Sequence, residues 1–465
     1  MGFIRSMTRR MVCWLGWDVE KINPVFTSTR QASILQPIRV AAGLREDEGP
    51  LMFWSSTTGA PVWHSPHHAY RKGVTSSPNG VAVGDTSQGK SSLNKTLVER
   101  LIEDEGRGTV FDRKKQQGEG YSSHGEYERL AASVPSTTLV LDRTPGRGVI
   151  INILDPRIAQ VDDEDTHAGQ DELLRLAAEV ALNRSLNQQE NTALSAAHQQ
   201  AITSASGEDR VPVLSDVVTA LYTLSTSSAP GPLREGKPVL EHLGLVGEST
   251  MVEWGLNVAL ALDRFIHGDL SGLIEGETRG PHGDPLDLSA PLIICDTTAL
   301  PQGSTSLGLM QLVVISFLES QWMSLPGDKI IIVEEAYSDE DVPRVARMLK
   351  RSSKRARGTG TMILSAYHHL SDVQPGSDLW SLIKETGVQY LFRQSSPKDA
   401  EAVCDFWDLD KDTYVPILTS LPKGCLLLCL GSNPPELVQH LRTEREIWIT
   451  DTDAALHSIQ KVSVA

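Results

Sequence analysis

The chain has 465 residues, of which 40% are hydrophobic and 22% charged, so it is long enough to bury one large core or two smaller ones. Its 43 Lys and Arg against 59 Asp and Glu give a formal net charge of -16, which argues against general electrostatic adhesion to nucleic acid or to an anionic membrane. The five cysteines form no metal-type sequence cluster, and we expect them to be buried thiols in a reducing cytosol.

Residues 1–75 form a lead-in to which the sequence assigns no fold, apart from a short β element over residues 51–62. The pattern changes at Asn79. Short aliphatic runs bounded by Gly, Pro or Asp predict strands near residues 79–83, 108–111, 138–141 and 149–153. We interpret residues 76–160 as the first half of an α/β core.

The eight residues from Gly84 to Ser91 read GxxxxGKS, the phosphate-binding P-loop, for which a chance glycine-rich turn is the alternative. An apolar strand precedes the loop and a helical pattern follows it over residues 92–102, which is the order that the motif requires. Glycines let backbone N–H groups turn toward phosphate oxygens, and the helix N-terminus adds partial positive charge. Lys90 is expected to neutralise phosphate charge and Ser91 to ligate Mg²⁺, so the predicted cofactors are ATP and Mg²⁺. The predicted nucleotide-binding residues are Gly84, Asp85, Thr86, Ser87, Gln88, Gly89, Lys90, Ser91 and Ser92.

Residues 161–285 have mainly helical spacing, and we interpret them as a helical insertion that covers the core. Residues 286–455 are the second half of the core, and residues 456–465 are a C-terminal tail. Strands are predicted in this second half near residues 291–295, 329–333, 361–364, 389–392 and 424–430. Strands that alternate with helices predict a largely parallel sheet with ligands at the carboxyl ends of its strands. The longest apolar run, residues 307–318, is too short to cross a bilayer and is expected to be a core helix.

The strand at residues 329–333 ends in two carboxylates, Glu334 and Glu335, the form expected of a Walker B element. In a P-loop NTPase the first acid supports Mg²⁺ through its water shell, and the second polarises the attacking water. We therefore predict Glu334 as a residue of the metal site and Glu335 as the catalytic base. The alternative is a pair of solvated acids at a strand end, and Glu334 stands where Asp is usual.

His368 follows the next predicted strand and is placed to sense the γ-phosphate through a hydrogen bond, with a structural histidine as an equal alternative. Between these two strands Arg344, Arg347, Arg351 and Arg355 recur at helical spacing. A solvated basic face is the simplest interpretation of this run. The alternative is an arginine finger that reaches the phosphates of a neighbouring subunit.

These motifs in this order resemble the conjugative-transfer ATPases of type IV secretion systems, the TraC-like motors related to HerA and FtsK, over roughly residues 55–455. Phe111-Asp112-Arg113-Lys114 followed by Gly125-Glu126-Tyr127 looks like the DPKGEY signature of the family, interrupted by a polar insertion at residues 115–124. Residues 151–156 are similar to its NPLDP segment, and residues 368–372 resemble its HRLSD segment. Glu334-Glu335-Ala336 followed by Lys354-Arg355-Ala356-Arg357 looks like its DEAW and KxxR motifs.

The resemblance implies a RecA-like homo-hexamer with ATP at the subunit interfaces and arginine fingers donated in trans, for which Arg355, Arg357 and Arg393 are candidates. It also implies partners among the components of a secretion or conjugation channel at the inner membrane. The corresponding location is the cytoplasm or the inner face of the cell membrane. Because the P-loop begins at Gly84, we expect the large N-terminal domain usual in the family to be missing and the chain to be a reduced motor.

We therefore predict an α/β P-loop NTPase with a RecA-like, mostly parallel sheet and a helical insertion, acting as an ATPase that energises conjugative DNA transfer or type IV secretion. One alternative is a DNA-pumping translocase of the coupling-protein or HerA type, against which the acidic balance and the lack of a predicted membrane anchor weigh. The other is a nucleotide-binding scaffold with little turnover, which Glu334 at the usual Asp position favours.

Overall fold

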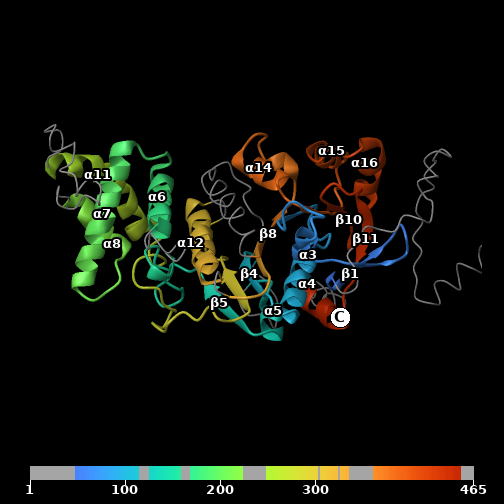
Figure 1. The fold of residues 1–465 in the computed structure, drawn as a ribbon, viewed down its shortest axis with the longest axis horizontal. Coiled ribbons are helices and arrows are strands. Elements are labelled where there is room, and N and C mark those ends of the chain that lie inside the picture. Colours follow the sequence, from blue (N-terminus) through green and yellow to red (C-terminus); the bar gives the residue numbers. More distant parts are fainter. Residues whose placement is uncertain are drawn as a thin grey trace, which may run out of the picture. The chain divides into compact units, whose positions relative to one another are not determined.

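The computed structural model describes residues 48–114, 125–158, 168–223, 248–301, 304–322, 325–334 and 360–451. Within these ranges eleven strands form one sheet, in the order β2-β1-β11-β10-β9-β3-β8-β7-β4-β6-β5 (Figure 1). The strands are β1 (Leu51–Ser55), β2 (Pro61–Trp63), β3 (Gly80–Val83), β4 (Arg107–Asp112), β5 (Ser136–Val140), β6 (Leu292–Asp296), β7 (Lys329–Val333), β8 (Thr361–Tyr367), β9 (Val388–Leu391), β10 (Cys425–Leu430) and β11 (Glu436–His440).

The seven strands from β9 to β5 in this order run parallel to one another. β6, β7 and β8 are buried along their whole length, because hydrophobic clusters cover both faces of the sheet. Within β7, Ile330 and Ile332 belong to one cluster while Ile331 and Val333 belong to the other. Burial on both faces explains why these strands read as unbroken aliphatic runs.

Helices supply the other side of each cluster. One cluster receives side chains from α4 (Lys90–Glu103), α5 (Glu128–Ser133) and α17 (Glu444–Thr450). The other receives them from α12 (Thr305–Trp322), α14 (Asp378–Lys384), α15 (Pro397–Phe406) and α16 (Lys411–Ser420). Two short elements complete this part of the chain, α3 (Pro66–Arg71) and the 3₁₀ turn η6 (Leu370–Asp372). Helices that pack on both faces of a mostly parallel sheet are the layered arrangement expected of an α/β fold.

Four antiparallel strands, β10, β11, β1 and β2, extend the sheet beyond β9. The predicted β element is present as the hairpin of β1 and β2, and it joins the same sheet as the P-loop strand. Phe53 of β1 lies opposite His440 of β11, and the blue and red strands are neighbours in Figure 1. The sequence predicted neither β11 nor this pairing between the two ends of the described chain.

The predicted strand at residues 149–153 is wrong. These residues form an irregular segment with one isolated bridge, between Ile150 and Arg279. Three aliphatic side chains of the segment are nevertheless buried in the core, and the Asn152 side chain donates to the carbonyl of Pro212 at 2.8 Å. A short apolar run therefore indicated burial correctly, but it does not distinguish a strand from a buried connection.

The described part of the predicted helical insertion holds four α-helices: α6 (Ala168–Leu182), α7 (Gln188–Gly207), α8 (Leu214–Tyr222) and α11 (Glu248–Arg264), with a π turn, η5 (Phe265–Asp269), after α11. A capping box starts α7, since the Asn187 side chain accepts from the Glu190 backbone at 2.8 Å and the Glu190 carboxylate accepts from the Asn187 backbone at 3.0 Å. α11 packs against α6, α7 and α8, and α6 also contacts α12 and the 3₁₀ turn η3 (Pro156–Ile158). The apolar faces of the insertion are thus continuous with the core on one side of the sheet.

The predicted core helix at residues 307–318 is confirmed as part of α12, which is apolar around its whole circumference. Across the portion of the chain that the structure describes, no helix combines the length and the apolar character that crossing a bilayer requires. Cys425 and Cys429 lie on one face of β10, as their spacing predicts, and Cys295, Cys404 and Cys429 are buried.

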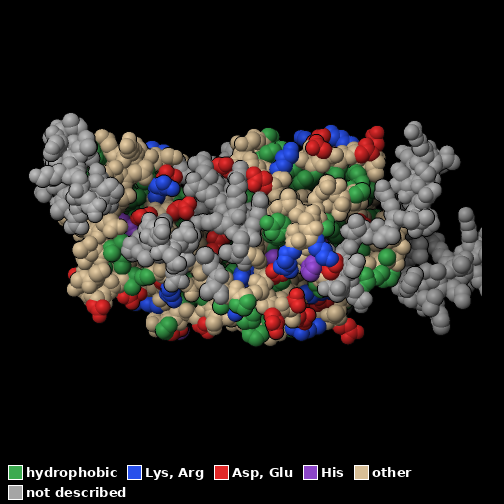
Figure 2. Space-filling view, in the orientation of Figure 1, with side chains coloured by type: hydrophobic (Ala, Val, Ile, Leu, Met, Phe, Trp, Pro, Cys, Tyr) green, Lys and Arg blue, Asp and Glu red, His purple; other side chains and the backbone are tan. Residues whose placement is uncertain are grey.

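Charged side chains of both signs are interspersed on the visible surface. Figure 2 shows Lys and Arg scattered among Asp and Glu outside the grey residues. Opposite charges this close together cancel at longer range. The described part of this face therefore carries no extended basic field.

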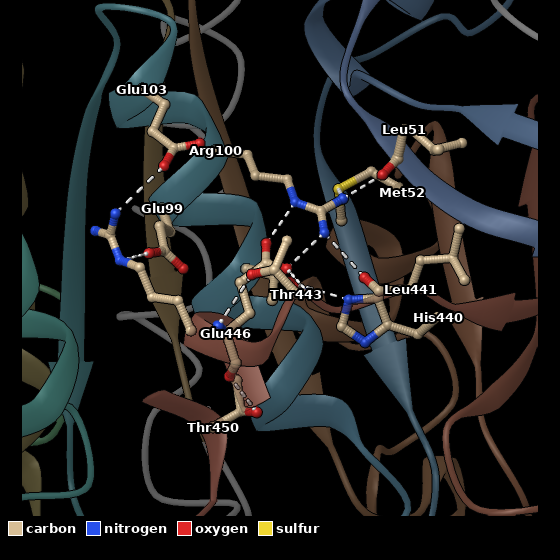
Figure 3. A network of polar contacts seen from close by, with 12 residues as sticks. Leu51, Met52, Glu99, Arg100, Glu103, His440, Leu441, Thr443, Glu446 and Thr450 are labelled. Atoms are coloured by element: carbon tan, nitrogen blue, oxygen red, sulfur yellow. Dashed lines mark hydrogen bonds and ion pairs between the residues drawn. The ribbon is translucent and has the colours of Figure 1, made fainter. Parts of the chain in front are cut away.

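The far end of α4 is fastened to the C-terminal helix α17, as Figure 3 shows. Arg100 donates to both carboxylate oxygens of Glu446, at 2.6 and 2.9 Å, and to the carbonyl of Leu441 at 2.9 Å. Arg445 of α17 pairs back with Glu99 of α4, with Nε and Oε1 3.0 Å apart. Bidentate guanidinium–carboxylate pairs are among the stronger polar contacts in proteins. The helix that begins in the P-loop is therefore also fixed at its other end.

Two buried histidines make the fold sensitive to acid. Burial lowers the pKa of His64 to about 3 and that of His440 to about 3. His64 Nε2 is hydrogen-bonded to the Tyr390 hydroxyl at 2.7 Å, and His440 Nε2 to the Thr96 hydroxyl at 2.8 Å. Both histidines take up a proton near pH 6.5 in the unfolded chain. Their contribution to stability is therefore fully present above that pH and is lost as the pH falls toward 3.

We expect His64→Asn and His440→Asn each to flatten the decrease in unfolding temperature between about pH 7.5 and pH 5, because one such histidine costs up to about 1.4 kcal/mol per pH unit below its unfolded pKa. Thermal unfolding at several pH values measures this slope. His267→Asn is the control, since the side chain of His267 is 76% exposed. Parallel pH profiles for the parent and both core variants would contradict the prediction.

Candidate functional site

The carboxyl ends of four parallel strands, β3, β8, β7 and β4, lie side by side at one edge of the sheet. The strand register sets the last residues of β3 and β8 opposite each other. Gly84 follows β3, His368 follows β8, Glu334 follows β7, and β4 ends at Asp112. The P-loop, the predicted phosphate sensor and the first predicted Walker B acid are therefore brought to the same edge, where ligands of parallel sheets bind.

The P-loop connects strand to helix as the motif requires, since β3 ends one residue before Gly84 and α4 begins at Lys90. Gly84 has a φ of 155° and Gly89 a φ of 117°. A Cβ atom on Gly84 would lie 2.5 Å from the Cβ of Phe392, so the close approach of the chain after β9 requires glycine there. Gly89 is the N-cap of α4 and carries no side chain, so the first turn has no side-chain cap. Helix geometry leaves the first N–H groups of α4 without intrahelical partners, which is the feature that binds phosphate at such a turn.

The Lys90 ammonium is folded over its own loop. It donates to the carbonyl of Gly84 and, at 2.8 Å, to that of Asp85. The same ammonium lies 3.2 Å from His368 Nδ1. The structure thus brings together two residues that the sequence predicts for one phosphate, although 278 positions separate them.

Two segments from the second half of the core brace the P-loop from outside. The Asp85 backbone donates to the carbonyl of Arg393 at 3.0 Å, and the Ser395 backbone donates to the Asp85 carboxylate at 2.6 Å. The Gly424 backbone donates to the carbonyl of Gln88 at 3.0 Å. Arg393 itself is exposed directly beside the loop, two residues after the end of β9, the strand that neighbours β3.

Glu334 is buried behind the P-loop and held by two donors. Its Oε1 accepts from the Tyr127 hydroxyl at 2.5 Å and from the Asn94 side chain at 3.1 Å. Burial, together with the carboxylate of Glu126, raises the pKa of Glu334 to about 8. Burial by itself would raise the pKa of Glu126 as well. The ammonium groups of Lys95 and Lys114 outweigh this effect and hold the pKa of that carboxyl below its ordinary value. Of these two neighbouring carboxyl groups, Glu334 is therefore the one whose neutral form is favoured.

The two halves of the interrupted signature meet in space. The Tyr127 backbone donates to the Asp112 carboxylate at 2.9 Å, and burial raises the pKa of Asp112 to about 7. A Cβ atom on Gly125 would lie 2.0 Å from Asp112 Oδ2, so only glycine fits against that carboxylate. The insertion at residues 115–124 lies outside the described residues. The residues that flank it bring Asp112 beside Gly125 and Tyr127.

One lysine links the P-loop to the acids. Lys114 Nζ lies 3.4 Å from Ser91 Oγ, 3.8 Å from Glu126 Oε1 and 3.9 Å from Glu334 Oε2. The Ser91 hydroxyl also lies near Glu126 and helps to lower the pKa of that carboxyl. The predicted magnesium ligand and the predicted Walker B acid therefore lie within reach of a single ammonium group.

Other predicted site residues lie outside the described residues: Glu335, the predicted base, and the arginine candidates Arg355 and Arg357, with the whole basic run from Arg344 to Arg357. Two residues near the site were not predicted from the sequence. Lys95 is fully buried with its ammonium 5.0 Å from the Tyr127 ring centroid, and nothing in its helical pattern signals this. Asp296 ends β6 opposite Asp112, and an acid directly after an aliphatic strand is a signal that could have found it.

The residues present fit a magnesium nucleotide. Lys90 and Ser91 lie at the helix N-terminus, and Glu334 faces Ser91 across Lys114. No group of three or more His, Cys, Asp and Glu in the described ranges is arranged to hold a metal ion by itself. This donor set suits Mg²⁺, which binds through one or two protein groups and otherwise through phosphate oxygens and water.

A cavity lies away from this site. It has a volume of about 960 Å³ and is lined by side chains from the last turns of α4, from α17 and from Asp328 just before β7. The residue before a parallel strand marks the amino-terminal edge of the sheet. This cavity contains none of the predicted site residues.

No family model and no curated protein sequence matches the chain. Its structure is similar to that of VirB4 of Thermoanaerobacter pseudethanolicus, with a TM-score of 0.66 and 17% identity, over 87% of this chain and 100% of that chain. The bacterial conjugative coupling protein TrwBdeltaN70 matches with a TM-score of 0.47 and 14% identity, over 86% of this chain and 89% of its own. The likeness to VirB4 and the strand order confirm the predicted fold class, an α/β P-loop NTPase fold with a RecA-like, mostly parallel sheet and a helical insertion.

We expect Gly125→Ala to destabilise the protein by about 1–3 kcal/mol, because the added methyl group overlaps the Asp112 carboxylate and displaces it from the Tyr127 backbone. Chemical denaturation measures the loss. Gly207→Ala is the matched control, since Gly207 ends α7 and a Cβ there meets nothing within 4 Å. Equal stability of Gly125→Ala and the parent would show that the two halves of the signature are not in contact.

Proposed function

We propose that the chain is an ATP-hydrolysing motor that energises conjugative DNA transfer or type IV secretion. The observation that carries the proposal is the meeting of Lys90, Ser91 and Glu334 at one strand edge, in a fold similar to that of VirB4 over 87% of the chain. A P-loop opposite a buried acid from a nearby strand is the arrangement with which P-loop NTPases position a nucleotide and its metal.

Each site residue has a role that follows from its position. Bound MgATP supplies the phosphoanhydride bond and a metal that neutralises phosphate charge. Lys90 would exchange the carbonyls of Gly84 and Asp85 for phosphate oxygens, since the ammonium already lies over the loop. Ser91 would hold Mg²⁺ directly and Glu334 would hold it through water, because the Tyr127 and Asn94 donors occupy only Oε1. Glu335, the next residue, would accept a proton from the attacking water.

His368 is the group that would report phosphate occupancy. Its Nδ1 lies 3.2 Å from the Lys90 ammonium, at the end of the strand beside β3. When Lys90 turns to a phosphate oxygen, this imidazole loses one neighbour and lies within reach of the same phosphate. Because β8 lies between β3 and β7, a displacement of His368 would affect both the P-loop, which follows β3, and Glu334, which follows β7.

The active form in this proposal is a homo-hexamer with the nucleotide at subunit interfaces. Arg393 is exposed beside the P-loop and is one of three arginines, with Arg355 and Arg357, that could reach a neighbouring site. The proposed partners are components of a secretion or conjugation channel. The proposed location is the cytoplasm or the inner face of the cell membrane.

A nucleotide-binding scaffold with little turnover is the second candidate. Glu334 is one methylene longer than the usual Asp, and two donors already hold its Oε1. A carboxylate that is held in this way has fewer free lone pairs for the water shell of a metal than a solvated carboxylate has. Measured turnover separates the two candidates.

Lys90→Ala should weaken ATP binding by about tenfold or more, because it removes a charge-assisted phosphate contact. Glu335→Gln should keep ATP binding while reducing kcat by about 10²- to 10⁴-fold, because the general base is lost. Binding of a fluorescent ATP analogue and phosphate release measure the two effects. A parent that binds ATP but turns over no faster than Glu335→Gln would favour the scaffold, and a large rate increase with added DNA would favour a DNA translocase.

Arg393→Ala should reduce kcat by about 10³-fold if Arg393 is the finger that acts in trans. Mixing Arg393→Ala subunits with Glu335→Gln subunits should then restore activity, because each intact catalytic site receives its arginine from the other variant. Native mass measurement with and without MgATP gives the ring size of the mixture. If the mixed rings form and remain inactive, Arg393 does not act in trans.

A further inference from the structure

Lys114 lies two residues beyond the end of β4, with its ammonium among three groups of the candidate metal site. The distances are 3.4 Å to Ser91 Oγ, 3.8 Å to Glu126 Oε1 and 3.9 Å to Glu334 Oε2. The three groups come from different elements, namely α4, the turn before α5, and the end of β7. A single cation is therefore surrounded by the oxygens that a divalent ion would use.

An ammonium and a divalent ion cannot share this space. A magnesium ion held by Ser91 would lie about 2.1 Å from its hydroxyl, with water molecules filling the shell toward the carboxylates. Lys114 Nζ lies 3.4 Å from the same hydroxyl and within 3.9 Å of an oxygen of each carboxylate, so it occupies the region that this water shell would need. Like charges at such a separation repel strongly wherever water is largely excluded. Glu126 and Glu334 are 6% and 4% exposed, so water screens this repulsion poorly.

The Lys114 ammonium can move out of the candidate metal site. Its side chain is 40% exposed, so the ammonium has a path to solvent that a buried lysine lacks. Lys95, the other lysine near the acids, is fully buried and provides the fixed comparison. A lysine also holds carboxylates as a compact point charge on a flexible stem, without the planar geometry that fixes an arginine.

We propose that Lys114 is a tethered cation that competes with Mg²⁺ for Ser91, Glu126 and Glu334, so that the metal enters only by displacing the ammonium. Without a nucleotide the metal binds weakly, because it must displace the Lys114 ammonium, which already neutralises the carboxylates. The phosphates of a nucleotide add negative charge beside Ser91 and shift the balance toward the metal. Lys114 thereby couples metal entry to nucleotide entry. This inference rests on the proposed nucleotide site.

Metal binding without nucleotide tests the competition. The probe is Mn²⁺, followed by electron paramagnetic resonance as the free ion disappears, on the full chain without ATP. Lys114→Met should bind Mn²⁺ about tenfold more tightly than the parent, or better, because one positive charge has left the site. Lys114→Gln should do the same, and Lys114→Arg, which keeps the charge, should bind as weakly as the parent.

The control removes the same charge elsewhere. Lys411→Met deletes an exposed lysine at the start of α16, where its ammonium pairs with Asp405. It should leave the Mn²⁺ affinity at the parent value, which excludes an effect of net charge. Equal affinity of Lys114→Met, Lys114→Gln and the parent would overturn the proposal, provided that all unfold at similar temperatures in EDTA. If Lys114→Met unfolds early, the comparison of Lys114→Gln with Lys114→Arg decides.

A second measurement distinguishes failure of the Lys114 competition from failure of the proposed nucleotide site. Binding of a fluorescent ATP analogue in EDTA requires Lys90 but no metal. If Lys90→Ala removes this binding while Lys114→Met leaves Mn²⁺ affinity unchanged, the nucleotide site stands and the competition is wrong. If the parent fails to bind the analogue at all, the proposed function is wrong, and tighter Mn²⁺ binding by Lys114→Met then identifies a metal site without a nucleotide.

Discussion

The shared carboxyl edge of β3, β8, β7 and β4 is the constraint on which the candidate site depends. Parallel strands in register must end together, so the residue that follows each strand is brought to the same edge whatever its position in the chain. Gly84, His368 and Glu334 reach one another in this way. A change of register by one residue would shift the residue that each strand brings to this edge and would exchange the side chains packed on its two buried faces.

Three carboxyl groups lie together at this edge, and the neighbouring residues must balance their negative charge. Asp112, Glu126 and Glu334 are all buried, and charges in such a place require partners. Lys95 and Lys114 supply positive charge, and the raised pKa of Glu334 favours its neutral form. The two lysines differ in exposure, so one is a fixed part of the core while the other is exchangeable. The same acids that would hold a metal thus need a substitute cation.

Helix α4 ties this edge to the C-terminal part of the chain. Lys90 opens the helix in the P-loop, and Arg100 in its last turn is clamped by Glu446 of α17. β11, which leads into α17, pairs with β1 at the start of the described chain. The 14-residue helix therefore connects the P-loop edge directly to α17.

Local patterns in the sequence determined the P-loop, its flanking strand and helix, the aliphatic strands and the core helix α12, because glycine spacing and apolar periodicity act over a few residues. The predicted strand at residues 149–153 was wrong because a short apolar run indicates that residues are buried but does not indicate whether they pair with another strand. Only the tertiary structure decided that Asp112 and Tyr127 rejoin across an insertion, that Lys95 is buried beneath Tyr127, and that β11 pairs with β1. These contacts join residues that are distant in the chain, and their energy comes from packing and charge balance that no local window of the sequence contains.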